Sequence, residues 1–384
     1  MKFALFFGFI LFNSNIFSQT IRVGLYTEEN IKAVRFTDCS SNYLLVIDSV
    51  ITTVAITDTI DISILSGNDI SLSVNGLFFA SGKKIELIQV KNKNVIAVSP
   101  MLPFLKKRKY EGDFEIHVEK EMLKIINSLD IEDYLKGVIE SESGANLDFE
   151  YYKVQAVISR TYALKYWDRH DTEGYNMCNT THCQVYGLKR RGSILIDSAV
   201  RQTNGLVMKT EKNDFYPTFF HANCGGQTSE TDLVWNEKID YFNSFKDTFC
   251  LKTKQASWEQ VIPIKKWNDF LKQKYNLQVD SDTIMAMMSN FEQKNRLGFY
   301  LNPRFGIPLR DLRTQFNLKS TFFSTQIKDD FIYLKGKGNG HGVGLCQEGA
   351  IIMASIGYDY KQILGYYYSK MHLERNIKLI NSTD

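Results

Sequence analysis

The chain has 384 residues, of which 44% are hydrophobic and 23% are charged, a composition typical of a globular protein with two or three compact units. It contains only 6 Pro and 24 Gly, which excludes collagen-like and proline-rich disordered chains. The 46 basic and 43 acidic residues leave a net charge of +3. Residues 106–109 form a short basic run, interpreted as a solvated loop, so a nucleic-acid-binding function is not expected.

The first residues have the pattern of a secretory signal peptide. Lys2 precedes an apolar stretch from Phe3 to Phe12, and Ser18 supplies a small residue at a cleavage position. A membrane span needs about 20 apolar residues, so this stretch is short for an anchor. We therefore expect cleavage after Ser18 and an exported mature chain without a membrane span.

Residues 19–125 are predicted to be rich in β-strands. Short β-branched runs at 21–26, 43–47 and 85–90 are separated by polar turns. Residues 114–118 alternate apolar and polar side chains, as expected of a half-buried strand.

Residues 126–375 are predicted to mix helices and strands, with 255–330 as a separate part. A short helix is expected from Ile131, and Asp148 is placed to cap a helix from Phe149 to Trp167. Further helices are expected at 347–355 and 360–368. Because strands come first and helices later, the predicted fold class is α+β.

Five blocks in this second region each carry a different short motif: residues 133–143, 153–163, 183–186, 221–230 and 338–350. In this order they resemble the stage II sporulation protein D and amidase-enhancer (SpoIID/LytB) family. The resemblance covers roughly residues 125–370 and leaves the first hundred outside. It implies a cell-wall protein, because the sporulation members are lytic transglycosylases of peptidoglycan and the amidase enhancers are named for stimulating a wall amidase.

The resemblance places the family's catalytic glutamate at Glu142. Cleavage of a glycosidic bond needs a donor that keeps its proton near neutral pH, and an apolar pocket raises a carboxyl pKa by penalising the charged form. The nearby Tyr134 and Leu135 are candidates for such a pocket. The same glutamate can then take the proton of the sugar's 6-hydroxyl, which gives a 1,6-anhydro product. The alternative is an exposed glutamate at a helix end, as we expect for Glu140.

Other polar residues of these blocks are candidates for substrate binding, with structural roles as the alternative. They are Gln155, Arg160, Tyr162, His221, Thr228 and His341. For Arg160 the alternative is a buried ion pair with a carboxylate.

A cluster of Cys and His residues follows the second predicted helix. Cys178, His182 and Cys183, with His170 as a further ligand, have side chains that bind zinc tetrahedrally. The resemblance also implies zinc here, because some family members are believed to hold it with two Cys and a His. The rival is a Cys178–Cys183 disulfide, which export permits. A metal here would be structural, and the acid–base step requires no cofactor.

The remaining cysteines lie further apart in the sequence. Cys224 and Cys250 flank one segment and are expected to form a disulfide, whereas Cys39 and Cys346 have no assigned partner.

The sequence therefore predicts an exported lytic transglycosylase that acts on peptidoglycan glycan strands. The alternative is a non-catalytic wall-binding protein that stimulates an amidase or scaffolds wall remodelling. The family's Glu-Met-Pro reads Glu142-Ser143-Gly144 in this chain, a departure that leaves room for the alternative. A weaker third hypothesis is a zinc hydrolase that uses the Cys/His cluster.

Overall fold

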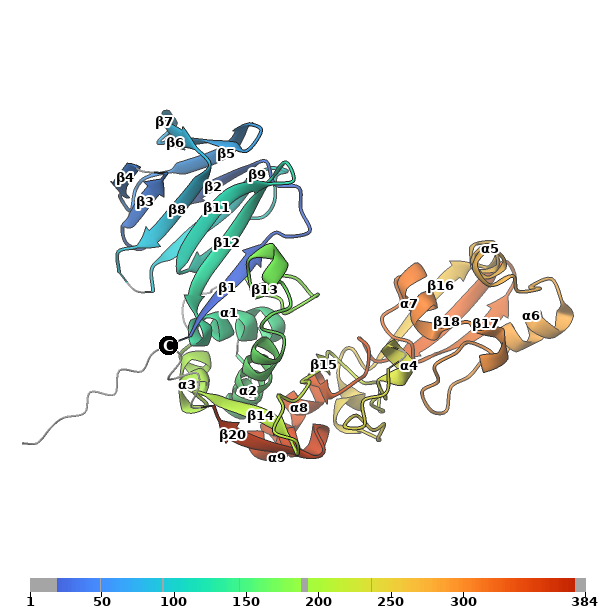
Figure 1. The fold of residues 1–384 in the computed structure, drawn as a ribbon. Helices are drawn as coiled ribbons and strands as arrows, with labels where there is room; N and C mark the ends of the chain where they lie inside the picture. The colour runs from blue at the N-terminus through green and yellow to red at the C-terminus, as the bar shows by residue number, and fades with distance from the viewer. Residues whose placement is uncertain are drawn as a thin grey trace, which may run out of the picture.

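The computed structural model describes residues 19–48, 50–91, 93–144, 146–187, 193–235 and 237–376. The predicted signal peptide lies outside the described residues. The structure is α+β, as predicted, with a strand-rich N-terminal region followed by mixed helices and sheets (Figure 1).

The N-terminal region consists of two sheets packed face to face. The first has the strand order β13-β1-β12-β11-β8-β3-β4, and the second has the order β10-β9-β2-β5-β6-β7. Phe36 of β2 and Phe114 of β11 meet edge to face across the two sheets, with ring centroids 5.4 Å apart. The strands are β1 (Thr20–Leu25), β2 (Ala33–Thr37), β3 (Tyr43–Ile47), β4 (Val50–Val54), β5 (Ile60–Ser66), β6 (Asp69–Val74), β7 (Leu77–Gly82), β8 (Lys84–Gln89), β9 (Val95–Leu102), β10 (Arg108–Glu111), β11 (Asp113–Glu119), β12 (Met122–Asp130) and β13 (Met177–Cys178).

Part of the basic run is strand rather than loop. Arg108 and Lys109 begin β10, which pairs antiparallel with β9, so the loop interpretation is wrong for these two residues. The Arg108 guanidinium lies 5.9 Å from the centre of the Tyr26 ring, which gives it a packing role.

The two predicted regions share one hydrophobic core. Strand β12 runs past the boundary expected at residue 125 and ends at Asp130, whose side chain caps α1 (Ile131–Ser143) by accepting from the backbone N–H groups of Glu132 and Asp133. The buried side chains of both sheets continue without a break into those of the helices. The sheets therefore hold α1 at a fixed position.

Helix α2 (Phe149–Lys165) lies at the centre of the helical region. Asp148 caps it as predicted, and almost every residue from Tyr151 to Ala163 is buried. A helix that is buried on all sides shows no amphipathic stripe, which explains its mixed sequence. Around it lie α3 (Ile194–Gln202), α8 (Gln347–Ser355), α9 (Tyr360–Tyr367) and the β14–β20 pair (Leu206–Thr210 and Met371–Arg375).

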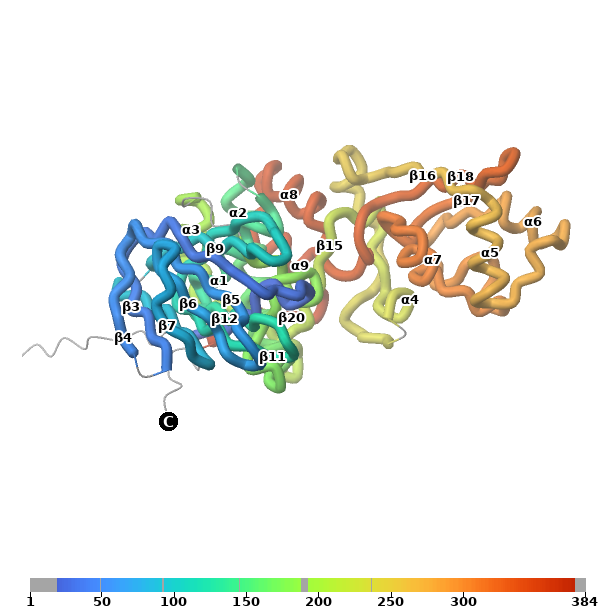
Figure 2. Tube along the Cα trace, turned by 90° about the horizontal axis from the view of Figure 1, so that it is seen from above, coloured from blue at the N-terminus to red at the C-terminus, as the bar shows by residue number. Residues whose placement is uncertain are grey.

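The chain then leaves the body to build an arm and returns (Figures 1 and 2). The arm has its own core, in which Trp267 and Phe316 stack with centroids 4.6 Å apart. Its elements are β16 (Ser257–Pro263), α5 (Ile264–Tyr275), α6 (Asp282–Ser289), η3 (Pro303–Phe305), α7 (Leu309–Gln315), β17 (Phe323–Lys328) and β18 (Phe331–Lys337). The segments that join it to the body carry β15 (Phe220–His221), α4 (Asp232–Trp235), η2 (Phe249–Lys252) and β19 (Leu345–Cys346), while η1 (Asp171–Glu173) lies in the body.

Among the described residues, no helix has both the length and the apolar character that crossing a membrane requires.

A buried ion pair joins the first two helices. The Arg160 side chain is fully buried, and its Nε and Nη2 atoms donate to the Glu132 carboxylate at 2.7 and 2.6 Å. Arg160 Nη1 also donates to the Leu206 carbonyl at 3.0 Å. Arg160 thus takes the structural role considered for it.

Replacing Arg160 by Met should strongly destabilise the fold. The change leaves the Glu132 carboxylate without its partner, which costs about 3 kcal/mol of unfolding free energy in comparable pairs. Urea unfolding measures this loss, with Lys165→Met as the control, because Lys165 is an exposed cation on the same helix. Equal stabilities of the two variants would contradict the assignment.

Candidate functional site

A cavity of about 590 Å³ lies where segments distant in sequence meet. These include the ends of α1 and α2, the turn at 181–183, strand β15 with its flanks, the end of α4, the loop at His341 and the start of α8. The side chains that line it include Glu142, Tyr162, His182, His221, Trp235, His341 and Gln347. Four residues predicted from separate sequence blocks, Glu142, Tyr162, His221 and His341, therefore meet in one place.

Glu142 reaches the cavity as the last member of a buried helical stripe. Leu135, Val138 and Ile139 occupy positions i, i+3 and i+4 on α1 and are fully buried, and Glu142 follows at i+7. At Gly137 the helix lies so close to Tyr186 that an added Cβ would come within 2.7 Å of its ring. Tight packing along α1 thus fixes the direction of the Glu142 side chain.

The surroundings of Glu142 favour the protonated carboxyl group. Burial raises its pKa above the usual value, and the hydrogen bond that Val185 N donates to Oε1 at 2.7 Å opposes this shift. The direction agrees with that expected of a general acid. No lysine or arginine forms an ion pair with Glu142 within the described ranges, so burial prevails.

The backbone at Gly144, two residues after Glu142, has a conformation that proline cannot adopt. Helix α1 ends at Ser143, and Gly144 has φ +80°. Proline fixes φ near −65°, so a family-type proline could not adopt this conformation. Glu142 nevertheless faces the cavity.

Two histidines of the cavity are uncharged near neutral pH. His221 is buried, its Nδ1 donates to the Val343 carbonyl at 3.1 Å, and burial holds its pKa well below the usual range. Burial also lowers the pKa of His341 to about 4, and its Nδ1 accepts from Val343 N at 3.0 Å. The two rings lie 5.5 Å apart. The site therefore carries polar but neutral imidazoles opposite a carboxyl group.

Two polar atoms at the cavity lack a partner. Across the part of the chain that the structure describes, His221 Nε2 and Gln347 Nε2 are buried and have no hydrogen-bond partner. Since buried polar atoms are nearly always bonded, these two suit a ligand rich in hydroxyl or amide groups.

Two further residues of the cavity escaped the sequence analysis as site residues. Trp235 is 41% exposed, and its ring centroid lies 5.1 Å from that of His341. Arg169 donates to Tyr162 Oη at 2.7 Å and lies over the Tyr166 ring at 4.0 Å. Arg169 lies beyond the end of α2 and Trp235 on a distant segment, so helical spacing signalled neither.

Three of the predicted substrate-binding residues lie away from the cavity. Gln155 is buried within α2 and donates to Tyr151 Oη at 2.9 Å. Thr228 is buried and accepts from Phe245 N at 3.0 Å. Arg160 forms the ion pair described above. The contacts of all three are structural.

The first Cys/His cluster borders the cavity through His182 and Cys183. The ligand atoms of His170, Cys178, His182 and Cys183 all lie within 4.8 Å of one another, and His170 Nε2 lies 3.3 Å from Cys183 Sγ. Both cysteines are free thiols rather than a disulfide. Glu173 lies 3.5 Å from the other ring nitrogen of His170, the carboxylate–histidine arrangement common behind metal ligands. The donor set thus fits zinc.

The predicted Cys224–Cys250 disulfide is absent. Both residues are free thiols, and their sulfur atoms lie 3.3 Å apart, too far for a bond of ~2.05 Å. The prediction considered only the intervening loop and missed Asp247 and Cys346, which lie against the same two sulfurs.

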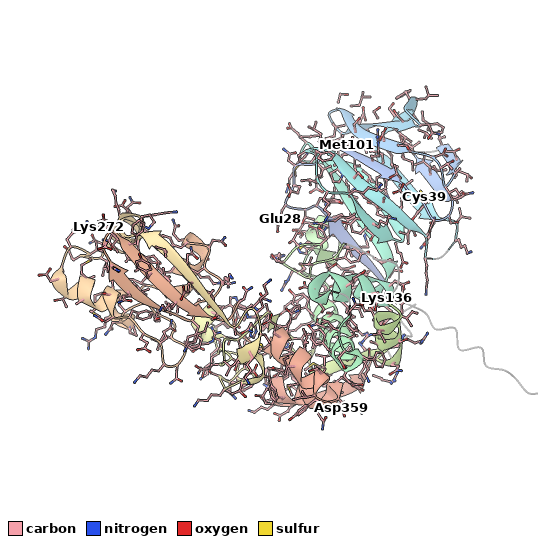
Figure 3. The ribbon with its side chains drawn as sticks, turned by 180° about the vertical axis from the view of Figure 1, so that it is seen from behind. Glu28, Cys39, Met101, Lys136, Lys272 and Asp359 are labelled. Atoms are coloured by element: carbon pink, nitrogen blue, oxygen red, sulfur yellow. The ribbon has the colours of Figure 1, made fainter. Side chains whose placement is uncertain are left out.

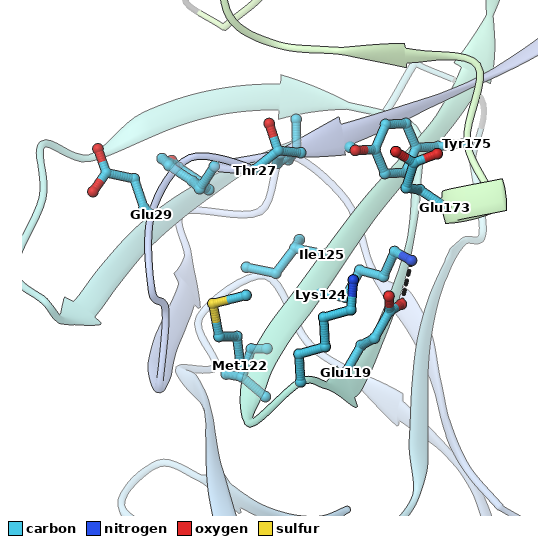
Figure 4. Close-up of a pocket in the computed structure, with 13 residues that line it drawn as sticks. Thr27, Glu29, Glu119, Met122, Lys124, Ile125, Glu173 and Tyr175 are labelled. Carbon is cyan, nitrogen blue, oxygen red and sulfur yellow. Dashed lines mark hydrogen bonds and ion pairs between the residues drawn. The ribbon is translucent and has the colours of Figure 1, made fainter. Parts of the chain in front are cut away.

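A smaller cavity of about 130 Å³ lies at the edge of the first sheet (Figure 4). Glu119 and Lys124 form an ion pair beside it, and Tyr175 closes one side. The residues that line it include neither histidine nor cysteine, so it lacks the donor set of the larger cavity.

The comparisons with known proteins point to the family that the sequence blocks resemble. Residues 119–209 match the family model described as stage II sporulation protein (SpoIID). An uncharacterized protein of Brachyspira hyodysenteriae is 30% identical over 275 residues, which cover 68% of this chain and 71% of that protein. The stage II sporulation protein D of Bacillus subtilis is 23% identical, with 67% and 78% covered, and the amidase enhancer of the same organism is 28% identical, with 61% and 39% covered. The chain belongs to the SpoIID/LytB family.

Proposed function

We propose that the chain is an exported lytic transglycosylase that cleaves peptidoglycan glycan strands with Glu142 as general acid and base. The observation that carries the proposal is a carboxyl group with a raised pKa in a cavity that also holds two neutral imidazoles. Membership of the family supports a role at the cell wall.

The proposed cleavage needs no water molecule as a reactant, because the 6-hydroxyl group of the sugar attacks C1. The Glu142 carboxyl group gives its proton to the glycosidic oxygen as the bond from that oxygen to C1 breaks. The carboxylate then removes the proton of the 6-hydroxyl, whose oxygen bonds to C1 and closes the 1,6-anhydro ring. Glu142 regains its proton, so one residue serves both steps.

The other cavity residues hold the glycan. Trp235 offers an exposed ring face for a sugar, while His221 Nε2 and Gln347 Nε2 supply an acceptor and a donor for sugar hydroxyl or acetamido groups. Both imidazoles stay neutral, so neither adds a charge that would lower the pKa of Glu142.

Replacing Glu142 by Gln should abolish the chemistry. Removal of a general acid costs about 10²–10⁴-fold in rate, so 1,6-anhydro products should fall at least 100-fold in mass-spectrometric assays of purified glycan strands. Glu140→Gln, two residues earlier on the same helix, is the matched control and should keep its activity.

Full activity of Glu142→Gln would overturn the catalytic assignment. If the wild type binds glycan strands or a cell-wall amidase but releases no product, the non-catalytic alternative replaces it. Intact and peptide-stripped glycans should be assayed in parallel.

The raised pKa of Glu142 also predicts how stability depends on pH. Its pKa is higher in the folded state than the unfolded value of ~4.3, so wild-type stability falls as pH rises from that value through the folded pKa. Gln cannot ionise and keeps an oxygen for Val185 N. The stability of Glu142→Gln relative to wild type should therefore increase from pH 4 to pH 7 in urea unfolding. A difference that is constant or shrinks with pH would contradict the raised pKa.

We also propose that His170, Cys178, His182 and Cys183 hold a structural zinc ion. When bound, the ion fixes the turn that carries His182 and Val185, and thereby the hydrogen bond to Glu142.

Protein purified without chelator should contain zinc that Cys178→Ser removes. Elemental analysis measures the loss, and Cys39→Ser is the control, because Cys39 is a buried cysteine in the N-terminal region, between β2 and β3 (Figure 3). A Cys178–Cys183 disulfide in the purified chain would refute the site.

A further inference from the structure

A second group of metal-binding side chains lies behind the cavity, outside the residues used above. It consists of Cys224, Asp247, Cys250 and Cys346, whose ligand atoms all lie within 4.8 Å of one another. All four residues are fully buried. They come from three segments: the residues after β15, the start of η2, and the junction of β19 with α8.

The spacing suits coordination better than a disulfide. Cys224 Sγ lies 3.3 Å from both Cys250 Sγ and Asp247 Oδ2. Zinc–sulfur bonds of ~2.3 Å in a tetrahedral site place sulfur atoms ~3.8 Å apart, and the observed 3.3 Å between the two sulfurs is nearer to this distance than to the ~2.05 Å of a disulfide. A single disulfide would also leave one of the three sulfurs unpaired, whereas a metal ion uses all three and the carboxylate.

The buried Asp247 side chain has no cationic side chain as a partner among the described residues. Asp247 forms no ion pair with a lysine or arginine of the described chain, although its carboxylate accepts from Tyr367 Oη and Phe249 N, each at 3.0 Å. An unpaired carboxylate in a core is costly. Arg296 comes close but donates to the Cys224 and Gln227 carbonyls, at 2.7 and 2.8 Å. A divalent cation within the group would supply the missing charge.

The hydrogen bonds around Cys346 suit a thiolate ligand. Its Sγ accepts from Cys224 N at 3.3 Å and from Gly349 N at 3.4 Å. Such N–H donors orient metal-bound sulfur and stabilise its charge. Gly349 also permits the close approach of α8, because an added Cβ would lie 2.8 Å from Asp247 Oδ2.

We propose that Cys224, Asp247, Cys250 and Cys346 form a second, structural zinc site behind the cavity. Thiolate sulfur and carboxylate oxygen are both ligands that zinc binds, and four of them from fully buried residues would make a closed site.

The site connects the two sides of the cavity. His221 lies three residues before Cys224, and Gln347 directly follows Cys346. A metal ion bound to both cysteines would fix the separation of the two unpartnered nitrogens proposed to contact the glycan. The zinc site itself does not depend on the proposed activity.

The test uses the full mature chain, purified without chelator, with Cys178 and Cys183 changed to Ser. This background removes the thiols of the first cluster, so remaining zinc reports the second site. Elemental analysis should find about one zinc per chain. The four remaining cysteines should all react as thiols after denaturation in chelator.

Adding Cys346→Ser to this background should lower the zinc content at least tenfold, whereas adding Cys39→Ser should leave it unchanged. Loss of zinc in the Cys346→Ser variant has a second explanation if that variant misfolds. The background protein is therefore also loaded with Co²⁺. The loaded protein should show sulfur-to-cobalt charge-transfer absorption and the visible bands of a tetrahedral ion. A background protein without zinc, or with a Cys224–Cys250 disulfide in non-reducing peptide mapping, would overturn the proposal.

Discussion

The candidate site depends on the burial of one carboxyl group, that of Glu142, at the end of a helix that capping and core packing hold in place. Helix α1 is capped by Asp130 at the end of β12 and packed through Leu135 and Val138 into the core that both sheets share. Glu142 follows on the same stripe, and one backbone N–H, that of Val185, fixes its position. Burial then outweighs this single hydrogen bond, so the pKa of Glu142 rises. The N-terminal sheets, which lie outside the resemblance, thus support the residue at its centre.

The opposite side of the cavity is built from segments that the arm separates in sequence. Phe220 and His221 of β15 pair in parallel with Leu345 and Cys346 of β19, more than 120 residues later. The close approach at Gly344, where an added Cβ would lie 2.1 Å from the Phe219 carbonyl, leaves room only for glycine. The glycines of this block therefore let two backbones lie side by side and bring His341 next to His221.

Local signals in the sequence predicted the helices well, and the resemblance predicted part of the site. Asp148 marked the start of α2, and residues 347–355 are helical as expected. The errors share a physical cause. Gln155 was predicted to bind substrate from its sequence block, but α2 is buried on every side, so a polar residue on this helix need not contact the cavity. The bridge between Ser229 and Val343 pairs the segment before α4 with a distant part of the chain, and Trp235 of this short helix lies next to His341.

The cysteines also show that spacing along the sequence does not reveal which side chains the fold brings together. Spacing along the sequence suggested that Cys224 and Cys250 pair with each other, yet the fold places both against Cys346, almost 100 residues further on. Both Cys-containing groups lie beside the cavity, where short turns and brief strands replace long elements. Short segments bury little apolar surface, so they need other constraints to hold a polar site in place. The proposed metal ions would supply such a constraint without filling the cavity with apolar side chains, and its polar atoms would stay available to a ligand.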